Sequence, residues 1–155
     1  MLPLAQLAPR ALYVHLPFCA RRCPYCDFAT APLRRDLERR TLSALAQEAQ
    51  QTLPAGWRPQ TIFLGGGTPS ELTQEGTRRL VEILAPWAAS AVEVSLEANP
   101  RTLRPTKLRA LIEGIGVNRV SLGAQSFSSR TLKRLGRFHK PEDVGKAVNV
   151  ARAAG

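Results

Sequence analysis

The stretch Leu12–Cys26, LYVHLPFCARRCPYC, joins a run of apolar, strand-forming residues to a loop that holds Cys19, Cys23 and Cys26. These are the only cysteines among the 155 residues. A four-iron, four-sulfur cluster bound by three thiolates keeps one iron without a protein ligand, and that iron is free to hold another molecule. Three closely spaced thiolates are therefore candidate ligands of a [4Fe–4S] cluster with an open iron site, directly after a strand.

Two other uses of the cysteines stay open at this point. A structural zinc ion would take His15 as its fourth ligand, although zinc motifs usually combine two separated pairs of ligands. A disulfide with one spare thiol would need an oxidising compartment and suits such close spacing poorly.

The chain alternates short apolar runs with longer segments of helical periodicity. Because this alternation is typical of βαβ units, we expect an α/β fold with a parallel sheet and functional residues at the carboxyl ends of its strands. The fourth strand would leave one edge of the sheet unpaired. We expect strands at Ala11–Leu16, Thr61–Leu64, Val92–Leu96 and Arg119–Gly123, and helices at Leu37–Leu53, Thr73–Pro86, Thr106–Glu113 and Pro141–Ala153.

Length and charge narrow the class of protein. A chain of 155 residues is long enough for one domain with a real core. The net charge is +10, but 18 of the 22 basic residues are arginines spread along the chain without a nucleic-acid-binding motif, so we expect no nucleic-acid partner. No stretch approaches the roughly 20 apolar residues of a membrane span, and residues 1–10 do not resemble a signal peptide. Together with cysteines suited to a reducing compartment, these features predict a cytoplasmic protein.

Leu64–Ser70, LGGGTPS, closes the second expected strand. Three glycines let a backbone approach a ligand closely, and the lysine of a phosphate-binding loop is missing. The same residues also fit a tight turn in which Thr68 caps a helix, with Pro69 at the first helical position and Glu71 three residues after the cap. Both interpretations can hold together.

Polar side chains follow the third and fourth expected strands. A carboxylate such as that of Glu97 could accept hydrogen bonds from the ribose hydroxyls of a bound ligand or balance a positive charge such as a sulfonium. Glu97 is better placed for this than Glu93, which lies earlier in the strand. The alternative is that Glu97 is an ordinary solvated glutamate. Gln125 offers amide donors and an acceptor to a nucleoside. Arg137 suits a carboxylate, whereas His139, near a helix start, is more typical of a structural residue.

Taken together, the motifs YVHLPFC, CPYCDF, GGGTPS, EANP, LGAQSF and LGRFH resemble the radical SAM superfamily, in the branch of the oxygen-independent coproporphyrinogen oxidases. The resemblance runs from about Tyr13 to the end of the chain and implies a partial (β/α) barrel of the TIM type. It also implies a [4Fe–4S] cluster on Cys19, Cys23 and Cys26, with S-adenosylmethionine on the open iron. The residues that it assigns to S-adenosylmethionine are Tyr13, Tyr25, Gly66, Gly67, Thr68, Glu97, Gln125 and Arg137.

Two departures choose between subfamilies. Phe28 stands where the oxidases carry a fourth cysteine, and only a dozen residues precede Tyr13 where the oxidases have a long extension. Both features resemble the HemW-type heme chaperones, which implies heme as cargo, heme-accepting respiratory proteins as partners and a homodimer as a further possibility. The alternatives are a radical SAM enzyme that oxidatively decarboxylates a tetrapyrrole and an inactive truncated fragment.

The resemblance also bears on domain organisation. Radical SAM cores usually have six βα units, and many members carry a further C-terminal domain. Because we expect four such units here, residues 1–155 are interpreted as the N-terminal part of a core, without its last strands and without a C-terminal domain.

Overall fold

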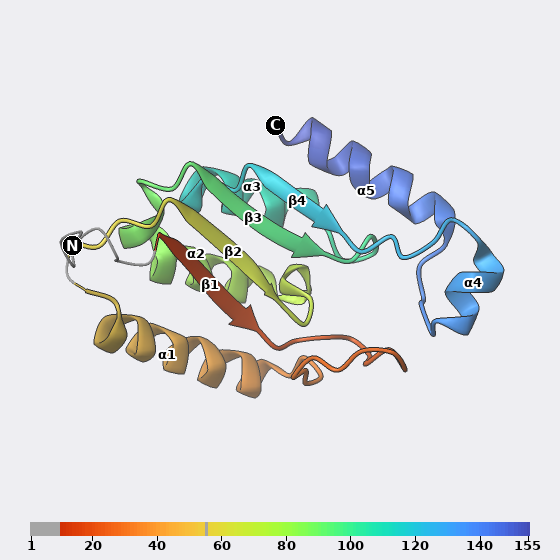
Figure 1. The fold of residues 1–155 in the computed structure, drawn as a ribbon, viewed down its shortest axis with the longest axis horizontal. Helices are drawn as coiled ribbons and strands as arrows, with labels where there is room; N and C mark the ends of the chain where they lie inside the picture. Colours follow the sequence, from red (N-terminus) through yellow and green to blue (C-terminus); the bar gives the residue numbers. More distant parts are fainter. Residues whose placement is uncertain (1–9, 55) are drawn as a thin grey trace, which may run out of the picture.

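A computed structural model describes residues 10–54 and 56–155. Within them, four strands form one parallel sheet in the order β1-β2-β3-β4 (Figure 1). All neighbouring strands are parallel, so their carboxyl ends lie at one edge of the sheet. The predicted α/β class is confirmed. The strands are β1 (Ala11–Leu16), β2 (Thr61–Gly66), β3 (Glu93–Ala98) and β4 (Arg119–Leu122).

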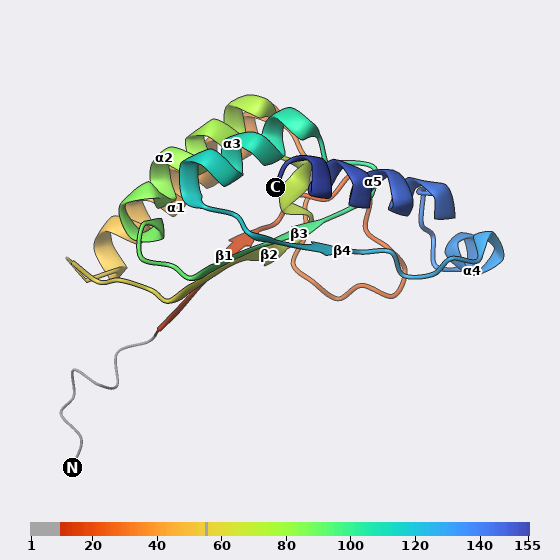
Figure 2. The ribbon, with the colours of Figure 1, turned by 90° about the horizontal axis from the view of Figure 1, so that it is seen from above.

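Helices cover one face of this sheet (Figure 2). The covering helices are α1 (Arg35–Thr52), α2 (Gln74–Ala88), α3 (Pro105–Ile115) and α5 (Pro141–Ala153). A 3₁₀ turn, η2 (Pro69–Glu71), follows β2, and the short helix α4 (Ser129–Arg134) lies beyond the carboxyl end of β4. In the described part of the chain, no helix covers the opposite face.

Alternation along the strands explains the one-sided packing. One set of strand residues is at most 2% exposed and forms the core against the helices: Val14, Leu16, Ile62, Leu64, Val94 and Leu96. On the other face, the ring of Tyr13 stacks on Phe63 with 6.0 Å between centroids, and Tyr13 stays 57% exposed. An open sheet with helices on one face is the arrangement of a partial (β/α) barrel.

Local signals fix the helix ends. The Thr73 hydroxyl accepts a hydrogen bond from the Gly76 amide at 2.9 Å and so caps the start of α2. Gly116 ends α3 in the left-handed region, at φ 71°. At the start of α5, the Lys140 amide donates to the Asp143 carboxylate at 2.9 Å, and Pro141 takes the first helical position.

All eight predicted elements are present, with ends that differ by no more than two residues. Two details of the prediction were wrong. Helix α4 was not expected, because its six residues are too few for a periodic pattern. The Thr68 side chain does not cap a helix, since Pro69 opens only the 3₁₀ turn and α2 takes its cap from Thr73.

Two further predictions concern membranes and export. No helix in residues 10–54 and 56–155 combines the length and the apolar character that crossing a bilayer requires. The prediction for residues 1–10 falls almost wholly on residues 1–9, which lie outside the described residues.

Candidate functional site

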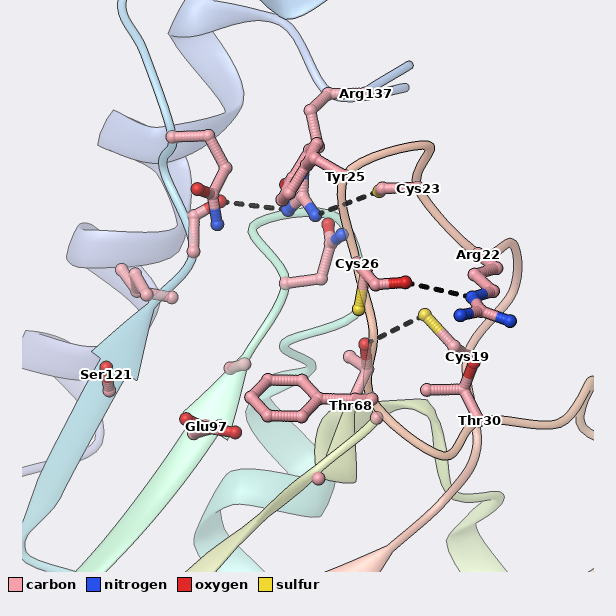
Figure 3. A pocket seen from close by; sticks show the side chains of 18 of the residues that line it. Cys19, Arg22, Cys23, Tyr25, Cys26, Thr30, Thr68, Glu97, Ser121 and Arg137 are labelled. Carbon is pink, nitrogen blue, oxygen red and sulfur yellow. Dashed lines mark hydrogen bonds between the residues drawn. The ribbon is translucent and has the colours of Figure 1, made fainter. Parts of the chain in front are cut away.

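A cavity of about 400 Å³ opens at the carboxyl edge of the sheet (Figure 3). The loops that follow all four strands form its wall, together with the segment between α4 and α5. Ten of the eleven predicted site residues line it, and Tyr13 is the exception. The lining residues are Cys19, Arg22, Cys23, Tyr25, Cys26, Phe28, Thr30, Gly66, Gly67, Thr68, Glu97, Ala98, Asn99, Ser121, Leu122, Gly123, Ala124, Gln125 and Arg137.

The cysteine loop, residues 19–30, is fixed at both ends and irregular between them. A bridge between Phe18 and Ala31 closes its base, where the Cys19 amide donates to the Ala31 carbonyl at 3.0 Å. Inside the loop, the Cys26 amide donates to the Cys23 carbonyl at 3.0 Å, and Arg22 Nε donates to the Cys26 carbonyl at 2.9 Å. These bonds hold the loop in a shape that brings all three cysteines to the cavity wall.

The three thiols are free and have different surroundings. Cys19 Sγ lies 3.4 Å from the Thr68 hydroxyl, and buried Cys23 accepts from Arg137 Nη1 at 3.7 Å (Figure 3). Tyr25 lies close to Cys23 and Arg137. Burial raises the pKa of Tyr25, the charge of Arg137 opposes this shift, and Cys23 adds to it.

The alternatives to a cluster find little support in these residues. No disulfide joins the thiols. His15 is engaged on both ring nitrogens, with Nε2 3.0 Å from the Ala29 carbonyl and Nδ1 3.3 Å from the Tyr13 hydroxyl. In the described part of the chain, no three His, Cys, Asp or Glu side chains converge as a single zinc ion requires. A cluster takes each thiolate on a different iron and does not need such convergence.

The glycine turn, residues 65–72, is packed tightly against the end of β1. A Cβ on Gly66 would lie 2.7 Å from Nδ1 of His15, and one on Gly67 would lie 2.6 Å from the Phe18 carbonyl oxygen. Gly66 also has a φ of 108°, which side chains rarely adopt. Contacts within the protein therefore require these glycines, before any ligand is considered.

A polar network ties the glycine turn to its neighbours. The Ser70 hydroxyl pairs with Thr102 and accepts from the Asn99 amide at 3.2 Å. Lys107 of α3 donates to the Ser70 carbonyl and, at 2.8 Å, to the Leu72 carbonyl. Burial lowers the pKa of Lys107, and the nearby Glu71 carboxylate opposes the shift.

The two glutamates of β3 differ as the sequence suggested. Glu97 lies at the carboxyl end of the strand, lines the cavity and receives no hydrogen bond on its side chain among the described residues. Glu93 lies at the other end, where Ser95 donates to it at 2.8 Å and Arg119 at 3.1 Å. Tyr13 lies outside the cavity, but burial and the charge of Glu97 both raise its pKa.

The segment after β4 carries a strained residue and two unpartnered atoms. Gln125 has a φ of 60°, a conformation that costs energy in a non-glycine residue and is common at functional sites. Arg137 Nη2 donates to the Gly123 carbonyl at 2.9 Å. Arg137 Nε and His139 Nδ1 are buried without a hydrogen-bond partner. An unpartnered guanidinium N–H in the cavity wall fits a carboxylate ligand.

His139 is 3% exposed, and its Nε2 donates to the Ala124 carbonyl at 2.9 Å. Since a carbonyl can only accept, the proton resides on Nε2. Burial lowers the pKa of His139, partly opposed by the bond to Ala124. The structural interpretation of this residue agrees with its position.

Several residues that line the cavity were not predicted from the sequence. Asn99 lies within the quoted EANP motif, and Ser121 is on the cavity side of β4, so their positions at strand ends were the signal that could have found them. Phe28 was noted only for the cysteine that it replaces, yet it lines the cavity and is 61% exposed.

The fold and the site define a class: an open parallel α/β sheet with a three-cysteine loop after its first strand and a polar cavity at its carboxyl edge. The pattern of the radical SAM superfamily matches residues 13–155, and the chain belongs to this superfamily. The resemblance seen in the sequence is thereby confirmed.

Curated relatives are more specific. The chain is 38% identical to the heme chaperone HemW of Escherichia coli K12, over 98% of this chain and 41% of the relative. It is 40% identical to the heme chaperone HemW of Mycobacterium tuberculosis H37Rv, over 95% of this chain and 39% of the relative. The chain thus spans about two fifths of the length of these relatives.

Among solved structures, the chain is similar to the coproporphyrinogen III oxidase HemN from Escherichia coli, described as a radical SAM enzyme. The TM-score is 0.82 at 32% identity, over 95% of this chain and 35% of that one. The likeness supports the partial-barrel description of the sheet.

Proposed function

We propose that this chain is part of a HemW-type heme chaperone in which Cys19, Cys23 and Cys26 hold a [4Fe–4S] cluster beside a site for S-adenosylmethionine. The observation that carries the proposal is that three free thiols share one cavity with Glu97, Gln125 and Arg137. The chain matches about two fifths of the length of these relatives, and we propose the heme-chaperone activity and its partners for the whole protein.

The cluster, when bound, supplies an open iron that chelates the amino and carboxylate groups of S-adenosylmethionine. Residues in the cavity wall would contact the same amino and carboxylate groups from the protein side. Gly66, Gly67 and Thr68 contact its amino end, and Arg137 offers its unpartnered Nε to the carboxylate.

The remaining polar residues suit the nucleoside part of the ligand. Glu97 accepts hydrogen bonds from the ribose hydroxyls, and Gln125 bonds the base. Tyr25 lines the cavity beside the cysteines. Tyr13 lies outside the cavity on the uncovered face of the sheet, close enough to Glu97 to feel its charge.

Heme is the proposed cargo. The curated relatives are named heme chaperones, and Phe28 stands in place of the fourth cysteine of the oxidases. Exposed Phe28 in the cavity wall and Phe127 after β4 suit an apolar macrocycle. Heme-accepting respiratory proteins are the proposed recipients, and the cytoplasm is the proposed compartment, because thiolates that bind a cluster need reducing conditions.

A second candidate is an oxidase-like enzyme, favoured by the fold similarity to coproporphyrinogen III oxidase. It would cleave S-adenosylmethionine under strong reductant and decarboxylate coproporphyrinogen. The two candidates share the cluster and the cavity, and they differ in turnover.

The first experiment is anaerobic reconstitution with iron and sulfide, followed by EPR of the reduced protein with and without S-adenosylmethionine. We expect a [4Fe–4S] signal that changes when S-adenosylmethionine is added. Retention of zinc without such a signal would contradict the proposal, and the lack of a cooperative melt would favour an inactive fragment.

Full-length protein then separates the two candidates. A heme chaperone takes up heme stoichiometrically and leaves coproporphyrinogen unchanged. Formation of 5′-deoxyadenosine together with decarboxylation would favour the oxidase.

A further inference from the structure

The guanidinium of Arg137 lies between two loops that are far apart in the sequence. Nη1 donates to Cys23 Sγ at 3.7 Å, and Nη2 donates to the Gly123 carbonyl at 2.9 Å (Figure 3). The contact joins residues 114 positions apart. Arg137 therefore connects the cysteine loop to the loop after β4, directly at one thiol.

The other two thiols have no comparable partner. Cys19 Sγ lies near the neutral Thr68 hydroxyl and the Arg21 carbonyl. Cys26 Sγ has no hydrogen bond among the described residues. Cys23 is also the one buried cysteine of the three, so the charge of Arg137 acts on it with little screening by water.

We propose that Arg137 is a positioning residue of the cluster, which donates a hydrogen bond to the Cys23 sulfur and thereby raises the reduction potential of the cluster. This inference rests on the proposed function, since it requires the cluster. A reduced cluster carries one more negative charge, and an N–H donor with a positive charge at a ligand sulfur stabilises that state. Nε of the same guanidinium is buried without a hydrogen-bond partner and is a further donor of this side chain.

The test is the midpoint potential of the reconstituted cluster, measured without S-adenosylmethionine by EPR-monitored redox titration. Arg137→Gln removes the charge, and we expect the equilibrium constant for one-electron reduction to fall about tenfold, which is ~59 mV for a one-electron couple. Arg137→Lys keeps the charge without the two-pronged geometry and should give a smaller fall.

Arg21→Gln is the matched control. Arg21 belongs to the same loop and carries the same charge, but its guanidinium lies over the Phe138 ring, 5.1 Å from the centroid, and not against a thiol. We expect its potential to stay close to that of the wild type. Equal shifts in Arg21→Gln and Arg137→Gln would overturn the inference, because net charge alone would then explain them.

The outcomes separate this inference from the proposed function. A wild-type cluster with an unchanged potential in Arg137→Gln overturns the inference and leaves the proposed function standing. If the wild-type chain forms no cluster, both are overturned. If Arg137→Gln loses its fold or its cluster, Arg137→Lys carries the test, and a wild-type potential in that variant overturns the inference.

Discussion

The cysteine loop and the glycine turn line the same cavity and touch where Cys19 meets Thr68, but they are held in place in different ways. Most side chains of residues 19–30 are exposed, and backbone hydrogen bonds hold the loop mainly at its base. In the glycine turn, the Gly67 amide donates to the Leu16 carbonyl at 2.9 Å and the Thr68 amide to the Phe18 carbonyl at 2.7 Å. Lys107 donates to the carbonyls of Ser70 and Leu72.

The difference shows how the chain divides the work of the site. The glycine turn gains its shape from β1 and α3, so its geometry exists before any ligand arrives. The cysteine loop has few internal hydrogen bonds, so its shape depends further on the contacts of its thiols, including the one with Arg137. Changes in the loop should therefore affect cluster binding, whereas changes in the turn should affect folding.

The largest effect is expected from Cys26→Ala. Loss of one thiolate ligand should lower the retained iron and sulfide roughly tenfold or more, since even loss of outer-shell partners costs metal sites about 10–100-fold in affinity. The melting of the cluster-free chain should stay the same, because Cys26 Sγ makes no hydrogen bond among the described residues. Iron analysis and a thermal melt check both statements. A variant that keeps its cluster, or that melts much earlier, would contradict the division between loop and turn.

In the glycine turn, Gly67→Ala should have the reverse effect. Its Cβ would lie 2.6 Å from the Phe18 carbonyl oxygen and 2.7 Å from the Pro17 carbonyl, both of which are backbone atoms. We expect the free energy of unfolding to fall by about 1–3 kcal/mol, as for other overpacked sites. Urea denaturation measures the change.

Gly145→Ala is the control for that substitution. Gly145 lies inside α5, and a Cβ there meets nothing within 4 Å. Alanine is the better helix former, so this variant should gain about 0.5–1 kcal/mol. Equal losses in both variants would mean that the glycine turn is not specially packed.

A loss of about 1 kcal/mol in the free energy of unfolding, at the low end of the range for a lost buried hydrogen bond, is expected from Lys107→Met, because Lys107 is only half-buried. The substitution would leave the Ser70 and Leu72 carbonyls without their donor, and an unsatisfied buried acceptor costs about 1–3 kcal/mol, less where water can reach it. Lys146→Met is the matched control, since the Lys146 side chain is 78% exposed and its ion pair with Asp143 is 3.8 Å long. If the two variants denature at the same urea concentration, Lys107 does not hold the turn.

The sequence was sufficient for most of the fold. Short apolar runs located all four strands, and the cysteine spacing, the three glycines and the ends of β3 and β4 located the cavity. The relations between these parts are what a linear pattern could not provide. Arg137 was assigned to a ligand carboxylate, and its contact with Cys23 depends on how the segment after α4 folds back on the sheet.

Lys107 and Thr68 show the same limit. Lys107 was one polar residue in an expected helix, and its acceptors lie 35 and 37 positions earlier in the chain. Thr68 followed a capping pattern, but its hydroxyl lies 3.4 Å from the Cys19 thiol instead. Local propensity identifies elements, whereas tertiary packing decides which side chains meet.

The smallest effect is expected from His139, which bonds the Ala124 carbonyl after β4 and makes stability depend on pH. Burial holds the pKa of His139 below its ordinary value of 6.5, so between the two values the unfolded chain binds more protons than the folded one. Stability from this residue is therefore complete above about pH 6.5 and is lost as the pH falls toward the lowered pKa.

His139→Gln keeps an amide donor for the Ala124 carbonyl but does not titrate. Urea midpoints measured from about pH 5 to 8 should change less steeply in this variant, because the other titrating groups are retained. Parallel curves for the two proteins would mean that the His139 imidazole titrates alike in the folded and unfolded chains, and that its burial beside the cavity has no energetic consequence.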